Sequence, residues 1–283
     1  MRPWLTRQAR PESLLGDMIN QLLMIGCGNM GGAMLAGWLT AGQDPARFAV
    51  LDPALAEVPA GVKLYRTADE AEAAGGHDAV LLGFKPQQLG ALGPGLQALT
   101  SSVTVCSLLA GITLAQLAVA FPQAAAHVRV MPNLAAAIGK SPVILATHGL
   151  DAGERDAVFA LFDILGTAMW LDGEAQFDLV TALAGSGPGF VYRFIDALAG
   201  AAADLGLDDG AAAKLALATV EGAAALAAAA DVSPATLADR VASPGGMTRE
   251  GLNVLDDGAA LRHLLTATLR ATRDKGAALS QGS

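Results

Sequence analysis

The sequence is poor in aromatic residues, in cysteine and in charge. Aromatic residues make up 5% of the 283 positions and charged residues 16%, whereas hydrophobic residues reach 53%. A chain of this length and composition can build two modest domains around a close-packed aliphatic core. Positive charge is especially scarce, because the formal net charge is −9. Nucleic acids and anionic membrane surfaces both attract basic proteins, so the composition argues against either as a partner.

The sequence also lacks the patterns of a metal or redox site. Its two cysteines, Cys27 and Cys106, have no CxxC or Cys/His neighbour. We therefore expect no zinc site, no redox motif and no bound metal, in a reduced, cytoplasmic compartment. The chain starts without an apolar signal core. We expect residues 1–20 to form a polar N-terminal arm; an alternative start at Met18 would leave residues 1–17 outside the native protein.

One uncharged stretch, residues 103–121, is about long enough to cross a membrane. It opens with β-branched residues, continues through Ser107, Gly111 and Thr113, and ends in a helical pattern. This order predicts a strand, a loop and a helix, with a membrane span as the alternative.

Short apolar runs alternate with helical stretches up to Trp170. This alternation predicts an α/β fold over residues 21–172, with a doubly wound parallel sheet covered on both faces. The predicted strands lie at the start of 21–42 and within 46–52, 61–65, 77–86, 101–111 and 125–133.

No strand pattern follows from Glu174 onward, so residues 173–283 are predicted to form an all-α domain. Its alanine-rich helices are apolar around much of their circumference and need more covering surface than one small domain supplies. This predicts a homo-oligomer.

A glycine-rich turn follows the first predicted strand. Gly26, Gly28 and Gly31 form a GxGxxG pattern between a strand and a helix, which is the setting of a dinucleotide-binding loop. Gly26 permits the turn, Gly28 admits a diphosphate close to the backbone, and Gly31 lets the helix pack on the strand. A glycine-rich turn without a ligand is the alternative. The loop residues expected to bind the cofactor are Gly26, Gly28, Asn29, Met30 and Gly31.

Asp52 ends the second predicted strand, where a carboxylate accepts hydrogen bonds from the ribose hydroxyls of NAD and repels a 2′-phosphate. This favours NADH over NADPH; a turn or helix-capping aspartate is the alternative, since Pro53 follows. Ligands of open α/β sheets bind beyond the carboxyl ends of strands, so two further loops should border the cofactor, although Lys85 can equally be a solvated surface lysine. The residues of these two loops are Phe84, Lys85, Pro86, Leu108, Leu109 and Ala110.

A second glycine-rich segment, SPGGMT at residues 243–248, interrupts the helical region. It offers consecutive backbone N–H groups at the start of a helix, beside the hydroxyl groups of Ser243 and Thr248. This arrangement suits a carboxylate or a phosphate, with a plain N-cap and turn as the alternative.

Taken together, these motifs resemble the pyrroline-5-carboxylate reductase family. The matching segments, in the order of the family, are GCGNMGGA (26–33), FKPQ (84–87), LLAGI (108–112), VMPN (130–133), TALAGSGPGF (181–190) and SPGGMT (243–248). The resemblance implies that residues 21–172 form a Rossmann dinucleotide-binding domain. It implies that residues 173–283 form a helical domain for substrate binding and dimerisation, which interlocks in a homodimer that is often assembled further into decamers. It also implies hydride transfer from NADH or NADPH to the imine carbon of 1-pyrroline-5-carboxylate, which gives L-proline, the final step of proline biosynthesis.

The resemblance also assigns roles to single residues. It implies that the loop backbone and Ser243 hold the substrate carboxylate, and that Thr248, as the catalytic residue, hydrogen-bonds the ring nitrogen. Asn133 and Ala110 match positions near the nicotinamide, and Glu174 matches a position near the substrate. A protonated imine needs positioning more than acid catalysis, so the scattered histidines receive no role. The implied substrate-binding residues are Glu174, Ser243, Gly245, Gly246, Met247 and Thr248.

Two other functions stay open on the sequence. A β-hydroxyacid dehydrogenase or imine reductase also joins a similar glycine loop to a helical domain. Those dehydrogenases carry a lysine on the helix that opens the second domain, and the segment after Gly187 has none. The other alternative is a non-catalytic dinucleotide-binding sensor, against which the intact SPGG segment and Thr248 argue.

Overall fold

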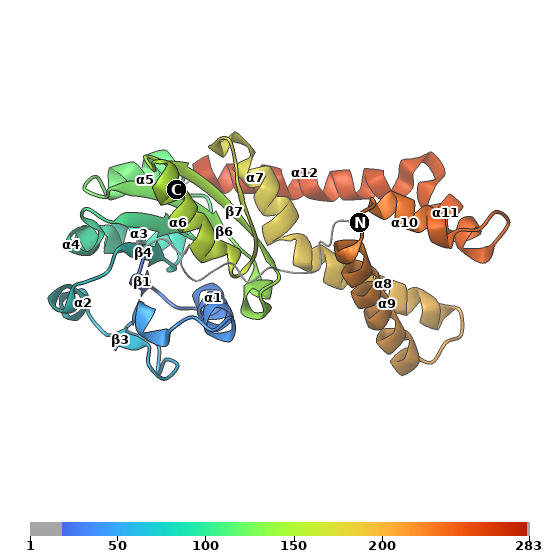
Figure 1. Ribbon diagram of the computed structural model, residues 1–283. Helices are drawn as coiled ribbons and strands as arrows, with labels where there is room; N and C mark the ends of the chain where they lie inside the picture. Colours follow the sequence, from blue (N-terminus) through green and yellow to red (C-terminus); the bar gives the residue numbers. More distant parts are fainter. Residues whose placement is uncertain (1–18, 282–283) are drawn as a thin grey trace. The chain divides into compact units, whose positions relative to one another are not determined.

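A computed structural model describes residues 19–281 of the chain as two compact units (Figure 1). Residues 19–186 and 271–281 make up the sheet unit, and residues 187–270 make up the helical unit. The predicted fold class, an N-terminal Rossmann sheet with a C-terminal helical region, is confirmed. The domain boundary at 172/173 stays a prediction, and the predicted arm lies outside the described residues up to residue 18.

The strands of the described chain form one sheet in the order β3-β2-β1-β4-β5-β6-β7-β8. All neighbouring pairs are parallel except β6 and β7, which are antiparallel. The six predicted strands are all present, whereas β7 and β8 were not predicted. The bounds are β1 Leu22–Ile25, β2 Phe48–Leu51, β3 Lys63–Tyr65, β4 Ala79–Leu82, β5 Thr104–Ser107, β6 Ala126–Met131, β7 Ser141–His148 and β8 Gly166–Trp170.

The antiparallel pair corrects the expectation of an entirely parallel sheet. Residues 132–140 connect β6 to β7, and they contain a 3₁₀ helix, Leu134–Ile138, that ends at Gly139 with φ of +65°. A crossover between parallel strands needs a dozen residues or more, so this short link returns the chain in the opposite direction.

Helices cover both faces of the sheet, and each face has its own core. Along β1 the side chains of Leu22 and Met24 join the core under α1 and α6, whereas those of Leu23 and Ile25 join the core under α2, α4 and α5. This period of two is what a strand buried on both faces requires. The helices of the sheet unit are α1 Asn29–Thr40, α2 Ala68–Ala74, α3 Leu89–Leu92, α4 Gln97–Thr100, α5 Leu114–Ala120, α6 Ala152–Asp163 and α7 Phe177–Val180, the last continuing into a π-helical turn, Thr181–Gly185.

Trp38 anchors α1 to the rest of its face. Its indole Nε1 donates a hydrogen bond to the carbonyl of Leu161 at 2.8 Å, and its ring stacks on Phe48 with centroids 5.2 Å apart. Because α1 follows the glycine loop, this buried contact fixes the loop relative to the sheet.

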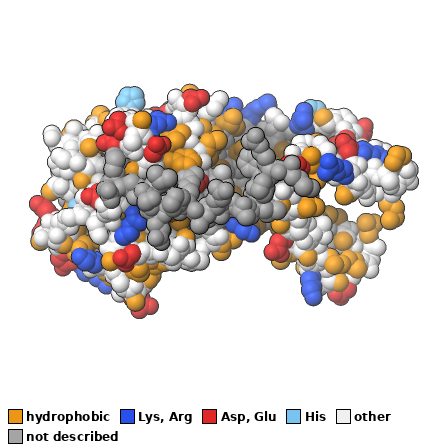
Figure 2. Space-filling view, in the orientation of Figure 1, with side chains coloured by type: hydrophobic (Ala, Val, Ile, Leu, Met, Phe, Trp, Pro, Cys, Tyr) orange, Lys and Arg blue, Asp and Glu red, His pale blue; other side chains and the backbone are white. Residues whose placement is uncertain are grey.

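The helical unit leaves much of its apolar surface exposed. Of its helices, α8, α10 and α11 bury no residue, and α9 buries Ala212 and Ala216. Tyr192, Leu217 and Val254 are each more than half exposed, and Figure 2 shows hydrophobic side chains gathered over α8 and α9. The bounds are α8 Gly187–Asp204, α9 Asp209–Ala229, α10 Pro234–Val241, α11 Met247–Asp256 and α12 Ala260–Gln281, whose last turns belong to the sheet unit.

Residues 103–121, for which a membrane span was the alternative, contain β5, a loop and α5, as predicted. Within residues 19–281, one helix, α9, is long and apolar enough to cross a membrane by its length and composition.

Candidate active site

The glycine loop lies at the carboxyl end of β1, wedged between the ends of β2 and β4. Gly26 has a φ of +84°, and a Cβ on it would stand 2.8 Å from the backbone nitrogen of Phe84. The N–H of Gly26 donates to the carbonyl of Leu51 at 2.9 Å, and that of Gly83 donates to Ile25 at 2.8 Å. A residue with a side chain fits this position neither in conformation nor in space.

Gly28 precedes α1 and leaves the start of that helix open. A Cβ on Gly28 would meet no atom within 4 Å, and no side chain caps the helix. The first N–H groups of a helix have no acceptor within it and carry the positive end of its dipole. The N–H groups of Asn29, Met30 and Gly31 therefore offer a site for a diphosphate. Gly31 also lies inside the helix–strand contact, since a Cβ there would stand 3.2 Å from the carbonyl oxygen of Gly26.

Asp52 lies beside the glycine loop at the end of β2. Its Oδ2 accepts a hydrogen bond from the N–H of Cys27 at 3.0 Å, and its Oδ1 accepts from Ala54 at 2.9 Å and Leu55 at 3.2 Å. The carboxylate therefore does stabilise the turn that follows β2, as the alternative interpretation required. It also holds that turn against the glycine loop, where the ribose of a dinucleotide would lie.

The loops after β4 and β5 differ in what they expose. Lys85 is exposed, and its N–H donates to the side chain of Gln88 at 3.0 Å; Phe84 and Pro86 are half-buried. Leu109 is 2% exposed, so its side chain belongs to the core, and Leu108 is partly buried against the opposite face. Ala110 is exposed and begins the wall of a pocket. Of the residues that were predicted to border the cofactor, Lys85 and Ala110 are thus the ones with exposed side chains.

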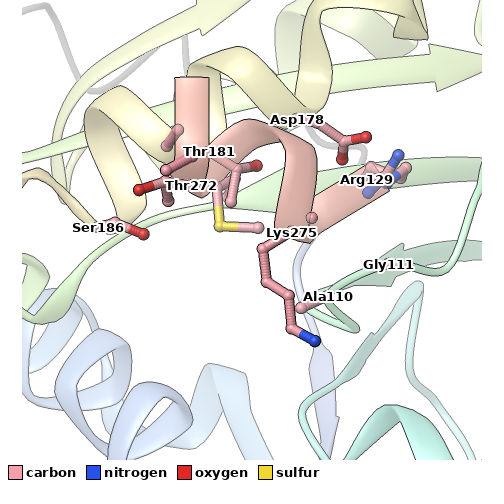
Figure 3. A pocket seen from close by; sticks show the side chains of 12 residues that line it. Ala110, Gly111, Arg129, Asp178, Thr181, Ser186, Thr272 and Lys275 are labelled. Carbon is pink, nitrogen blue, oxygen red and sulfur yellow. The ribbon is translucent and has the colours of Figure 1, made fainter. Parts of the chain in front are cut away.

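A pocket of about 490 Å³ opens in the sheet unit beyond the carboxyl ends of β5 and β6 (Figure 3). Arg129 and Asp178 lie at one end of it and Ser186 at the other, and Lys275 extends from α12 toward Ala110. This is the edge of the sheet where open α/β folds bind their ligands. The polar residues of its lining are Arg129, Asp178, Thr181, Ser186, Thr272 and Lys275.

Arg129 is a buried cation held by Glu174. Its Nη1 donates to Glu174 Oε1 at 2.6 Å, and its guanidinium stacks 3.8 Å from the ring centroid of Phe177. The same carboxylate oxygen accepts from the N–H of Leu114 at 2.9 Å. The side chain of Arg129 is 5% exposed and that of Glu174 28%. Glu174 therefore reaches the pocket through Arg129, which it orients.

Asn133 is buried just beyond β6 and ties two segments together. Its Nδ2 donates to the carbonyl of Ala184 at 2.9 Å, and its Oδ1 accepts from the N–H of Ala135 at 2.9 Å. Its own N–H donates to Ser141 Oγ at 2.9 Å. Asn133 thus fixes the π-helical turn 181–185, which carries pocket residues; such turns frequently occur at functional sites.

SPGGMT lies in the helical unit, at the start of α11. Gly246 is the N-cap residue without a side-chain cap, and Gly245 has a φ of +71°. The N–H of Gly246 donates to the carbonyl of Ser243 at 2.9 Å, which closes a tight turn. Met247 is 94% exposed, so its side chain contributes no packing within the chain. The turn leaves the N–H groups of Met247 and Thr248 at an open helix start.

Both cysteines are buried thiols. Burial raises the pKa of Cys106 to about 12. Burial, and then the negative charge of Asp52, raises the pKa of Cys27 to about 11. Both therefore stay protonated and unreactive near neutral pH. In residues 19–281 no group of three or more His, Cys, Asp or Glu side chains is arranged to hold a metal ion.

Sequence reasoning missed the charged residues of the pocket. The sequence could have indicated Arg129, because it is a single charged residue within the otherwise apolar β6. Nothing in the sequence indicated Asp178 and Lys275, since they lie on helices distant in the sequence and come together only in the folded chain.

Comparison with known proteins places these features in one family. Residues 174–279 match the family model described as pyrroline-5-carboxylate reductase dimerisation, and residues 21–111 match the model described as NADP oxidoreductase, coenzyme F420-dependent. The pyrroline-5-carboxylate reductase of Methanosarcina acetivorans is 34% identical over 90% of this chain and 97% of its own length. That of Pseudomonas aeruginosa is 33% identical over 82% and 87%.

A solved structure points to the same family. A pyrroline-5-carboxylate reductase from Coxiella burnetii is similar with a TM-score of 0.85 and 29% identity, over 93% of this chain and 99% of that one. The chain therefore belongs to the pyrroline-5-carboxylate reductase family.

Proposed function

We propose that this chain reduces the C=N bond of 1-pyrroline-5-carboxylate to give L-proline, with NADH or NADPH as the hydride donor. Two helix starts carry the proposal. Among the described helices of seven or more residues with a defined N-cap, α2, α5, α6, α9 and α10 are capped by a Thr, Asp or Ser side chain. By contrast, α1 and α11 begin after Gly28 and Gly246 with no side-chain cap. Open helix starts bind anions, and this reaction requires two: a diphosphate and a carboxylate.

The start of α1 binds the diphosphate of the cofactor in this proposal, and Asp52 binds the adenosine ribose. A carboxylate offers about four lone-pair sites, and three backbone N–H groups already use three of those of Asp52. About one site is left, which suits one ribose hydroxyl. The negative charge of Asp52 repels a 2′-phosphate, so NADH is the preferred cofactor.

The start of α11 binds the substrate. Its backbone N–H groups and the Ser243 hydroxyl hold the carboxylate, and the Thr248 hydroxyl accepts a hydrogen bond from the protonated ring nitrogen. The nicotinamide supplies the hydride to the imine carbon. The positive charge on the ring nitrogen is lost as the hydride arrives, so the step needs no proton from the protein. Positioning is then the main contribution of the protein.

The pocket beyond β5 and β6 is proposed to receive the reacting end of the cofactor, close to Ala110. Arg129 and Lys275 place two positive charges around it, with Asp178 as the counter-charge. Glu174 acts here as a positioning residue, because its carboxylate fixes the guanidinium of Arg129.

Self-association completes the proposal. The exposed apolar residues of α8, α9 and α11 cannot be covered within one helical unit that buries so little. We propose a homodimer built through residues 173–283, because residues 174–279 match a family model whose description names dimerisation. Assembly of such dimers into a decamer is a further step of the proposal. The acidic composition and the two thiols fit a cytoplasmic enzyme.

Substitution of Thr248 tests the assigned chemistry. Thr248→Ala should lower turnover at saturating substrate at least about ten-fold, because without the hydroxyl group the ring nitrogen is no longer held in the orientation that hydride transfer needs. The dissociation constant for NADH should not change. Thr266→Ala, an exposed threonine of α12 in the same unit, is the matched control and should behave as the wild type. Equal turnover in both variants would remove Thr248 from the mechanism.

A further inference from the structure

Arg66 directly follows β3 and is bound to the loop that carries Asp52. Its Nη1 donates to the carbonyl of Asp52 at 3.3 Å and also to the carbonyl of Leu55, and its Nη2 donates to Ala56 at 3.1 Å. These three bonds hold an exposed guanidinium on the rim of the turn after β2.

The ends of β2 and β3 lie side by side at this point. The N–H of Asp52 donates to the carbonyl of Tyr65, the residue before Arg66, at 3.1 Å. The carboxylate of Asp52 accepts a hydrogen bond from the N–H of Cys27 in the glycine loop, and the carbonyl of the same residue accepts one from Arg66. A ribose bound to this carboxylate would therefore have the guanidinium beside it.

The charges around this position oppose one another. Asp52 carries a negative charge that disfavours a 2′-phosphate, and Glu70 adds a second, because its Oε2 accepts from the backbone N–H of Arg66 at 2.6 Å. Arg66 is the cation that is hydrogen-bonded to this loop. A guanidinium has five N–H donors in a fork that fits phosphate oxygens. Three of these bonds go to carbonyls, so two donors are left for a ligand.

We propose that Arg66 is a specificity-determining residue that contacts the 2′-phosphate of NADPH and offsets the repulsion by Asp52. The inference rests on the proposed function, since it assumes that a nicotinamide dinucleotide binds with its ribose at Asp52. It adds that the preference between the two cofactors is a balance between Asp52 and Arg66. Asp52 favours NADH, and Arg66 preserves the use of NADPH.

The test compares Arg66→Gln with the wild type in direct binding of NADH and NADPH to the full-length protein, without substrate. We expect the dissociation constant for NADPH to rise at least about ten-fold more than that for NADH, as the loss of charge-assisted hydrogen bonds predicts. Arg66→Lys should restore part of NADPH binding, because it keeps the charge and loses the fork. Lys63→Gln, an exposed cation of β3, is the matched control and should leave the ratio unchanged.

A purely structural role gives a different result. If Arg66 only braces the turn through its carbonyl contacts, Arg66→Gln weakens both cofactors equally, and Arg66→Lys rescues neither selectively. That outcome, or an unchanged ratio, overturns the inference. Wild-type protein that binds neither NADH nor NADPH would instead overturn the proposed function. The double variant Asp52→Ser/Arg66→Gln should bring the ratio back toward the wild-type value.

Discussion

Substitution of Gly28 by alanine separates cofactor binding from folding. Gly28 has φ of −70° and ψ of −158°, an extended conformation that alanine adopts, and a Cβ there meets no atom within 4 Å. The free energy of unfolding should change by less than about 1 kcal/mol, because lower entropy of the unfolded chain and a poorer N-cap act in opposite directions. In the proposed assignment, the added methyl group would occupy the open space through which a diphosphate reaches the start of α1.

Loss of one or two hydrogen bonds to that diphosphate costs about 1.5–3 kcal/mol. This corresponds to a rise of about 10- to 150-fold in the dissociation constant for NADH. Titration calorimetry measures the constant, and thermal unfolding without cofactor measures stability. Wild-type affinity in Gly28→Ala would refute the assignment of this loop to the diphosphate.

Gly26→Ala is the contrasting variant. Its φ of +84° costs alanine about 1–2 kcal/mol, and the contact of 2.8 Å with the backbone of Phe84 adds to that. The melting temperature should fall by at least about 2–4 °C. A variant as stable as the wild type would contradict the close approach of β1 and β4.

Further predictions concern the ion pair, the thiols and the assembly. Glu174→Gln leaves the charge of Arg129 unpaired and should lower the free energy of unfolding, measured by urea titration, by about 1.5–3 kcal/mol. Asp196→Asn, in the exposed pair with Arg193, is the control and should not lower it. A Glu174→Gln variant as stable as the wild type would contradict the buried ion pair. The pKa values of Cys27 and Cys106 are raised to about 11 and about 12, so the folded state keeps these two protons to a higher pH than the unfolded state does. The free energy of unfolding should therefore fall by about 1.4 kcal/mol per pH unit for each thiol above about pH 9. The fall should end near pH 11 for Cys27 and near pH 12 for Cys106. Cys106→Ala should reduce this slope, and a stability independent of pH in that range would show that the thiols are accessible. Light scattering on a sizing column should give a dimer or a larger species, and a stable monomer would mean that the apolar faces of α8 and α9 tolerate water.

The sequence predicted the sheet as far as β6, because each of those strands is an apolar run with clear punctuation. β7 was missed because it starts Ser141-Pro142, and a proline at the second position is atypical of a central strand. β8, Gly166–Trp170, is short and mixes small with bulky residues. The antiparallel return between β6 and β7 depends on the length of a loop, which a pattern of apolar residues does not encode.

The candidate site divides in the same way. Local patterns predicted the tight turns of the glycine loop and of SPGGMT, because neighbouring residues build both, and their ligands stay predictions. The position of Asp52 beside Cys27 depends in addition on the pairing of β1 with β2. The cluster of Arg129, Asp178 and Lys275 depends on packing between distant segments. The contacts of Arg66 with the carbonyls of Leu55 and Ala56 depend on a fold of the β2–β3 connection that its sequence does not show.

The most direct test of the account is the oxidation of NADH and NADPH, measured in parallel, on addition of 1-pyrroline-5-carboxylate, with the product identified. We predict turnover with L-proline as the product and a higher kcat/KM with NADH than with NADPH. Binding of the cofactors without any oxidation would contradict the account and would mean that the chain has kept the fold and lost the reaction.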